Sequence, residues 1–361
     1  MTATRAAVDL DDGDGLLAAD RHGLLRAASM AGAQVRATAA AFDEGDLDLL
    51  RSGQPPRTVI WVAGRGAAQT AGAMLAAALG ASLAAPMVMA AEAPPWIGAL
   101  DVLVVAGDDP GDPVLVAAAA TAVRRGARVV VAAPFEGPLR DVTVGRSVAL
   151  APRMWVPDDF GLTRYLAAGV AALTVVDPGL HADLGAMADE LDAEVLRNSA
   201  GRELFTNPAK ALAEKMSGRD VVLAGDNAAT LALARHGAAV ILRIAQQTVA
   251  AAGLGDVLVA LRMGLGRSGE DAGRSLFHDE EIDGPLPRRV RTFVLTTAAE
   301  RPVVTARVSG YDGVDVLDAE DVPPGPDAAE PARLSGRPEQ QLATMAVRLE
   351  MAAVYLRLVR G

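Results

Sequence analysis

Residues 58–79 have the sequence TVIWVAGRGAAQTAGAMLAAAL and decide the fold expected for the chain. The first six residues are apolar with β-branched members, which is typical of a buried parallel strand. Gly64-Arg65-Gly66 predicts a turn, and residues 67–79, rich in alanine, methionine and leucine, predict a helix. Because a helix N-terminus presents free N–H groups, the unit predicts either an anion site or a tight core connection.

The common sequence motifs of nucleotide-binding and catalytic sites are absent from the sequence. The fingerprint G-x-G-x-x-G requires a glycine where this chain has Gln69, so a nicotinamide site has little support. There is no H-E-x-x-H, Walker loop or G-x-S-x-G, which removes the zincin, NTPase and hydrolase interpretations. No cofactor and no metal are expected.

The composition indicates a globular protein of two domains. The chain has 361 residues, of which 51% are hydrophobic and 22% charged. A net charge of −11 without a Lys/Arg cluster argues against nucleic acid as a partner. The absence of cysteine excludes disulfides, thiolate zinc sites and a Cys nucleophile, and it fits a reducing compartment.

A cytoplasmic location without membrane contact is expected. The first residues are rich in aspartate, which is wrong for a secretory signal. Residues 67–91 carry no charge and exceed the ~20 residues that span a bilayer. They are interrupted by Pro86, however, so a helix followed by a strand is the preferred interpretation.

From residue 58 onward, strand and helix patterns alternate. Helices are expected at 67–79 and 114–125, each ending near a glycine. Strands are expected at 58–63, 83–88, 101–105, 127–132 and 147–150. Short apolar strands joined by helical crossovers predict an α/β fold with a parallel sheet covered on both faces.

The second half of the chain repeats this pattern. Helices are expected at 158–176, from 181 and at 208–216, the last with Asn207 as N-cap. Residues 220–236 then predict a strand, a turn and a helix, and further apolar runs complete a second sheet. These runs lie at 238–244, 256–261, 290–296 and 313–317. Residues 318–338 predict a loop.

A last helix is expected at 339–360 and should pack on the body. It carries apolar residues beyond one stripe, among them Met345, Leu349, Tyr355 and Leu358. A helix with two apolar faces must bury both. A homodimer would do so, and burial of both faces within one chain is the alternative.

Several local segments resemble the bifunctional phosphoglucose/phosphomannose isomerase family of sugar isomerase (SIS) proteins, within it a divergent TobH-like branch. The turn at 63–66 is similar to the family's G-x-G-G-S turn, and 151–153 to its Pro-Arg motif. Residues 207–213, 276–282 and 353–356 are similar to three further family segments. The resemblance implies two tandem SIS-like, flavodoxin-like α/β/α domains at 1–155 and 156–330, and a C-terminal helix at 331–361.

The resemblance also implies which residues form the site. Glu281 would be the base that moves a proton between two sugar carbons, with His278 beside it. The residues expected to bind a sugar phosphate are Gly64, Arg65, Gly66, Gly107, Asp108, Asp109 and Arg153. Each has a plainer interpretation: an acidic surface loop around Glu281, packing for His278, a solvent-facing Arg65, and a salt bridge from Arg153 to Asp158 or Asp159.

The sequence departs from the family where phosphate and ring chemistry would occur. The family's hydroxyl-rich second loop is replaced by one with Asp108, Asp109 and Asp112. These carboxylates would repel phosphate; binding Mg²⁺ or capping a helix are their alternatives. Glu300-Arg301-Pro302 lacks the family's ring-opening His, and no Lys follows Lys215.

Three functions stay open on this sequence. The first is a sugar-phosphate-binding relative whose site is degenerate and weakly active or inactive. The second is an active aldose–ketose isomerase that interconverts fructose 6-phosphate with glucose or mannose 6-phosphate. The third is a structural partner of another sugar-phosphate enzyme.

Overall fold

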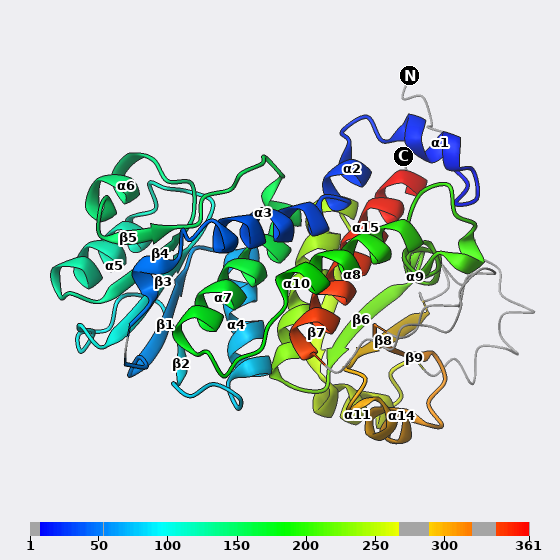
Figure 1. Ribbon diagram of the computed structural model, residues 1–361. Coiled ribbons are helices and arrows are strands. Elements are labelled where there is room, and N and C mark those ends of the chain that lie inside the picture. The colour runs from blue at the N-terminus through cyan, green and yellow to red at the C-terminus, as the bar shows by residue number, and fades with distance from the viewer. Residues whose placement is uncertain (1–7, 53, 267–288, 320–336, 361) are drawn as a thin grey trace, which may run out of the picture. The chain divides into compact units, whose positions relative to one another are not determined.

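The computed structural model describes residues 8–52, 54–266, 289–319 and 337–360. These residues divide into two compact units. Residues 23–196 with 337–347 form one, which we call the five-stranded unit after its sheet. The rest of the described chain forms the other, the four-stranded unit. Two parallel sheets and a C-terminal helix confirm the expected α/β fold class (Figure 1).

All strands of the five-stranded unit are parallel, in the order β2-β1-β3-β4-β5. Their bounds are β1 Thr58–Ala63, β2 Met87–Ala90, β3 Asp101–Ala106, β4 Arg128–Ala132 and β5 Ser147–Ala149. The strand expected from residue 83 begins later, at Met87. Pro86 just before it has no N–H for a ladder, and its carbonyl accepts a hydrogen bond from Val59 N at 3.0 Å.

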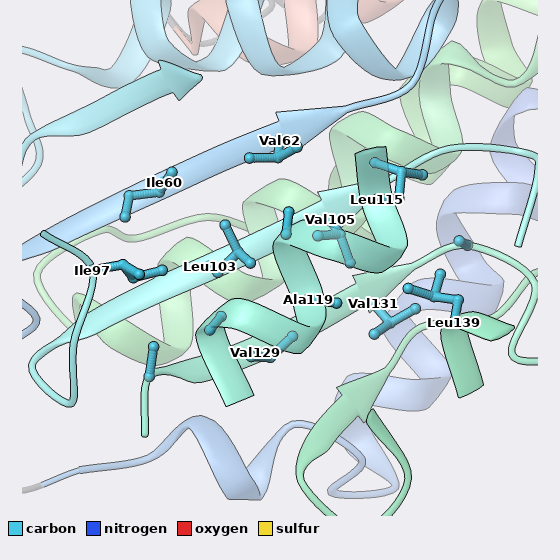
Figure 2. Packing of buried hydrophobic residues seen from close by; sticks show 14 residues of the cluster. Ile60, Val62, Ile97, Leu103, Val105, Leu115, Ala119, Val129, Val131 and Leu139 are labelled. Carbon is cyan, nitrogen blue, oxygen red and sulfur yellow. The ribbon is translucent and has the colours of Figure 1, made fainter. Parts of the chain in front are cut away.

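One face of this sheet is covered by α5 (Pro113–Arg124). Ile60 and Val62 of β1 and the alternate residues of β3 and β4 form a fully buried apolar cluster with this helix. Figure 2 shows Leu115 and Ala119 of α5 lying over these strands. Alternate strand residues point to one face, so the next residue of β1 must face the opposite side.

That next residue, Trp61, fills the opposite face between α4 (Ala67–Leu79) and α7 (Leu162–Val176). Its indole N–H donates to Ala68 O at 3.1 Å. A Cβ on Gly72 would lie 2.4 Å from the indole, and one on Gly169 would lie 3.0 Å from it. Two helical glycines are therefore required to admit the ring.

The remaining helices of this unit are α2 (Leu24–Ala28), α3 (Ala31–Asp43), α6 (Gly137–Thr143) and α8 (Leu184–Arg197). Arg36 on α3 forms ion pairs with Asp189 and Asp192 on α8. The helix expected over 158–176 is α7 preceded by a 3-10 turn at Asp158–Phe160.

The four-stranded unit has parallel strands in the order β7-β6-β8-β9. Their bounds are β6 Asp220–Gly225, β7 Val249–Gly253, β8 Val290–Leu295 and β9 Val314–Leu317. Its described helices, besides the C-terminal part of the last helix of the chain, are α1 (Gly13–Ala19), α9 (Pro208–Met216), α10 (Ala228–Ala245), α11 (Leu254–Arg262) and α14 (Arg301–Val308). The expected cap of α9 is confirmed, since the Asn207 side chain accepts from Lys210 N at 3.0 Å.

Two apolar runs expected as strands are helical. Residues 238–244 continue α10, and residues 256–261 lie in α11. Conversely, the residues of β7 are not among the apolar runs from which strands were expected. Short apolar runs do not separate strand from helix by periodicity, which explains both errors.

The C-terminal helix α15 (Pro338–Arg360) confirms the last helix expected. Its residues from Gln340 to Leu356 are all buried in the single chain. His236 of α10 and Glu350 of α15 form a buried pair, with 2.8 Å between His Nε2 and Glu Oε1. The apolar faces of α15 are thus covered without a second subunit and provide no argument for a dimer.

Among the described helices, α10 is long and apolar enough to cross a membrane by length and composition. Of its residues, 61% are buried inside the protein, as in a core helix. The uncharged stretch at 67–91 does not form one long helix, because α4 ends at Leu79 and β2 follows.

Candidate functional site

The first candidate site lies where β1 and β3 end side by side. The two strands pair in register up to Ala63 and Ala106, and Gly64 N donates to Ala106 O at 2.8 Å. Strand β2 pairs with one side of β1, and the next strand in sequence, β3, pairs with the other side. The direction in which the chain progresses through the sheet therefore reverses at β1. Ligands of open parallel sheets bind at such a switch point, outside the carboxyl ends of the strands.

Glycines lie where the two loops approach each other. A Cβ on Gly64 would lie 3.6 Å from the Cα of Gly107, and one on Gly107 would lie 2.7 Å from Leu115 Cδ1. Gly66, the N-cap of α4, has φ +75°, a backbone region that side chains rarely adopt. The structure therefore brings together three of the glycines that the sequence singled out.

An open cavity of about 630 Å³ lies at this edge. Small-molecule sites have volumes of about 300–1,000 Å³, so this one is large enough for a ligand, and we call it the switch-point cavity. Its polar lining consists of Arg65, Gln69, Asp109 and Asp112, beside Gly64 and apolar residues of β2 and α5. Within the described chain, no hydrogen bond or ion pair engages the Arg65 guanidinium. An uncommitted cation therefore lies in the cavity.

The aspartates of the second loop bind local backbone. Asp109 Oδ1 accepts from Gly111 N at 2.7 Å, and Asp112 Oδ1 accepts from Val114 N at 2.8 Å. Asp112 is the N-cap of α5, which confirms the capping interpretation. Asp108 is exposed and does not line the cavity. Among the described residues, no group of three or more His, Cys, Asp or Glu is arranged to hold a metal ion.

Arg153 lies elsewhere in the same unit. Its guanidinium binds Glu44 (Nη1 to Oε1, 2.9 Å) and Asp46 (Nη2 to Oδ2, 3.1 Å), not Asp158 or Asp159 as the salt-bridge alternative expected. Hydrogen bonding to Arg153 lowers the pKa of Glu44. The partners come from the loop after α3, which no spacing along the sequence relates to residue 153. Arg153 does not line the switch-point cavity.

The two residues expected to carry catalysis, His278 and Glu281, lie outside the described residues. Their roles stay predictions.

A second switch point occurs in the four-stranded sheet, between β6 and β8. The strands pair up to Gly225 and Leu295. A Cβ on Gly225 would lie 2.2 Å from Leu231 N, so only glycine lets α10 begin this close to the strand. Asn227 caps α10 through a reciprocal box with Thr230.

Carboxyl groups meet at this second edge. Asp226 accepts hydrogen bonds from Thr230 Oγ1 at 2.6 Å and from Thr296 Oγ1 at 3.0 Å. The amide of Asn227 donates to Glu300 Oε2 at 2.9 Å. A hydrogen bond with Asp226 raises the pKa of Glu300. Such a pair can accept or donate a proton near a bound ligand.

Sequence analysis identified the turn at 225–227 but not this cluster. The repeated strand–glycine–helix pattern was the available signal, because parallel strands place their following loops at one edge. In the sequence, Glu300 stands out only because the residue after it is Arg301 and not a histidine.

The fold of this chain is similar to that of several solved structures, although its sequence is not. No protein-family model and no curated protein matches the sequence. Among solved structures, the C-terminal domain of glucosamine-fructose-6-phosphate aminotransferase from Francisella tularensis is similar, with a TM-score of 0.60 and 11% identity. The similarity covers 94% of this chain and 97% of that one.

Two further structures are similar over nearly the whole chain. Tagatose-6-phosphate ketose/aldose isomerase from Escherichia coli has a TM-score of 0.58 at 15% identity, over 99% of this chain and 96% of that one. A glucose-6-phosphate isomerase like protein from Thermus thermophilus has a TM-score of 0.52 at 20% identity, over 98% and 94%. The chain thus has the fold of tandem SIS domains, as the resemblance implied.

Proposed function

We propose that the protein binds a phosphorylated carbohydrate in the switch-point cavity and interconverts it slowly or not at all. The observation that carries the proposal is the uncommitted guanidinium of Arg65 in a cavity at the carboxyl ends of β1 and β3. A guanidinium offers several N–H donors to phosphate oxygens. The fold shared with sugar-phosphate isomerases supports the choice of ligand class.

The carboxylates of the cavity determine how tightly phosphate binds. Asp109 and Asp112 can accept hydrogen bonds from sugar hydroxyls. They also repel a phosphate, by about 4 kcal/mol for a like charge ~4 Å away near a protein surface. Because the cavity has one guanidinium and two carboxylates, we expect the sugar phosphate to bind weakly. The sugar hydroxyls should contribute much of the affinity.

Slow turnover follows from the same lining. Aldose–ketose isomerisation needs ring opening and a base that transfers a proton between two carbons. Among the described lining residues there is neither a histidine nor a lysine, and both carboxylates accept hydrogen bonds from local backbone.

Calorimetry with fructose 6-phosphate tests binding. Arg65→Ala should weaken it, because it removes the cation of the cavity. Asp108→Ser with Asp109→Ser should strengthen it at least about tenfold, because the repulsion by Asp109 is removed. Arg146→Ala is the matched control, since Arg146 is exposed and precedes β5, at the opposite edge of the sheet.

Three results would contradict the proposal: no binding by the wild type, equal binding by Arg65→Ala, or an equal loss in Arg146→Ala. A coupled assay tests turnover separately. Interconversion with glucose or mannose 6-phosphate at the usual enzymatic rate of ~1–10³ s⁻¹ would show that the site is not degenerate.

An active isomerase is the second candidate, and the pair Asp226–Glu300 favours it. Hydrogen bonding with Asp226 raises the pKa of Glu300, and two carboxyl groups in contact can pass a proton between them. If this pair is the base, the substrate binds beside it at the second switch point, and Glu300→Gln should abolish turnover. Turnover unchanged in Glu300→Gln would remove this role.

We further propose that the protein belongs to the TobH-like branch, forms a homodimer and is located in the cytoplasm. These three proposals are supported by the family resemblance alone. Sedimentation equilibrium should give twice the chain mass of 37.0 kDa. A single-chain mass at micromolar concentration would contradict it.

A further inference from the structure

A cationic cavity lies in the four-stranded unit, at the C-terminal end of α10. It has a volume of about 390 Å³, within the range of small-molecule sites. Its walls are the end of α10, the end of α15 and the segment that follows α1. The lining consists of Val8, Ala19, Arg21, His22, Ile244, Ala245, Gln246, Arg357, Leu358 and Arg360.

The charge of this lining is opposite to that of the whole chain. The chain has 45 acidic against 34 basic residues and a net charge of −11. The ten lining residues nevertheless include three arginines and a histidine, and no carboxylate. Such a concentration of positive charge attracts an anion.

Two of the arginines are held in place by the end of α10. Arg357 Nη1 donates to Ile244 O at 3.1 Å, and Arg360 donates to Ala245 O at 3.3 Å and to Gln247 Oε1 at 2.7 Å. These bonds satisfy terminal helix carbonyls. A guanidinium has five N–H donors, so both arginines keep donors and their full charge for a ligand.

Capping does not account for Arg21 and His22. In the described part of the chain, no hydrogen bond or ion pair engages either side chain. They extend the cationic lining beyond what the helix end requires. Four basic side chains around one cavity, two of them fixed and two uncommitted, form a receptor for an anion with several oxygens.

We propose that this cavity binds an organic diphosphate, with Arg21, Arg357 and Arg360 contacting its phosphoryl oxygens. One phosphoryl group carries a charge of about −1.5 to −2, which is smaller than the charge of three guanidinium groups. Two linked phosphoryl groups therefore match the charge of the arginines better. The organic part lies along the apolar wall of Val8, Ile244 and Leu358.

This site is separate from the switch point of its own unit. Helix α10 starts at the carboxyl edge of its sheet and has 18 residues, so its C-terminal end lies about 27 Å from that edge. It also shares no lining residue with the switch-point cavity, so the proposal does not depend on sugar-phosphate binding there.

Calorimetry of the full chain with inorganic pyrophosphate and with ADP tests the proposal. One equivalent of each should bind, more weakly as salt rises. Arg21→Ala should weaken both about tenfold, or about 1.4 kcal/mol, without changing thermal unfolding, because no hydrogen bond or ion pair of the described chain is lost. Arg21→Ala with Arg357→Ala should remove detectable binding. ADP should bind at least as tightly as pyrophosphate.

Arg235→Ala is the matched control. Arg235 is exposed on the same helix, ten residues or about 15 Å from Ala245. Failure of the wild type to bind either probe, equal binding by Arg21→Ala, or an equal loss in Arg235→Ala would overturn the proposal. If ADP bound more weakly than pyrophosphate, the proposed contact between the organic part of the ligand and the apolar wall would be wrong. Fructose 6-phosphate titrated into Arg21→Ala should bind as in the wild type, which separates this site from the switch-point cavity.

Discussion

Substituting alanine for Gly225 tests how the four-stranded unit positions its second switch point. The added Cβ would lie 2.2 Å from Leu231 N and 2.4 Å from Leu231 Cα. Unbonded heavy atoms pack at about 3.5–4.0 Å, so the first turn of α10 must move by about 1 Å. Overpacking costs about 1–3 kcal/mol. We expect the upper part of this range, because backbone has no alternative rotamer.

Urea unfolding measures the effect in each unit separately. The three tryptophans, Trp61, Trp96 and Trp155, all belong to the five-stranded unit, so fluorescence follows that unit while far-UV circular dichroism follows both. Gly225→Ala should lower the dichroism midpoint by about 1 M and move the fluorescence midpoint less.

Gly255→Ala is the control, because a Cβ at this position of α11 meets no atom within 4 Å. Alanine there should be neutral or stabilise the helix by up to about 1 kcal/mol. The reasoning is refuted if Gly225→Ala is as stable as Gly255→Ala, or if the fluorescence midpoint falls as far as the dichroism midpoint.

Three further predictions concern single side chains. His236→Ala should cost about 1–3 kcal/mol in thermal unfolding, because it removes one hydrogen-bond partner of the buried Glu350 side chain; no measurable loss would contradict this. Gly66→Ala should destabilise the five-stranded unit by about 1–2 kcal/mol in fluorescence-monitored unfolding, because φ is +75°. The pKa of Glu300 is raised above 4.5, so the folded chain binds that proton more tightly than the unfolded chain. Its stabilisation is full below pH 4.5 and lost as the pH rises through the raised value; urea titrations should show that loss in the wild type and not in Glu300→Gln.

Features set by neighbouring residues could be predicted from the sequence. The bounds expected for the first strand and the first crossover helix agree with β1 and α4 residue for residue. Asn207 and Asp112 act as the caps that their positions before proline indicated. Hydrophobic pattern, glycine turns and capping residues all act over a few positions, so they are visible in one sequence.

Elements that depend on distant partners were less predictable. Strand β7 consists of Val249, three alanines and Gly253. Alanine favours helices over strands, and this segment is a strand because it pairs with β6 along its whole length. Likewise α10 continues past the expected end at His236, where the buried contact with Glu350 stabilises it.

The chemistry of the candidate sites depends on still longer separations. The Asn227 amide reaches Glu300 across 73 residues, and Arg153 reaches Glu44 across 109. Strand order alone brings the first pair together, since β6 and β8 are neighbours although β7 lies between them in sequence. A glycine turn therefore locates an edge of the sheet, whereas the charge that acts there is decided by which other strand ends beside it. Arg65 has no such partner among the described residues, whereas Glu300 lies beside Asp226, so the first edge favours an anion and the second brings two carboxyl groups together.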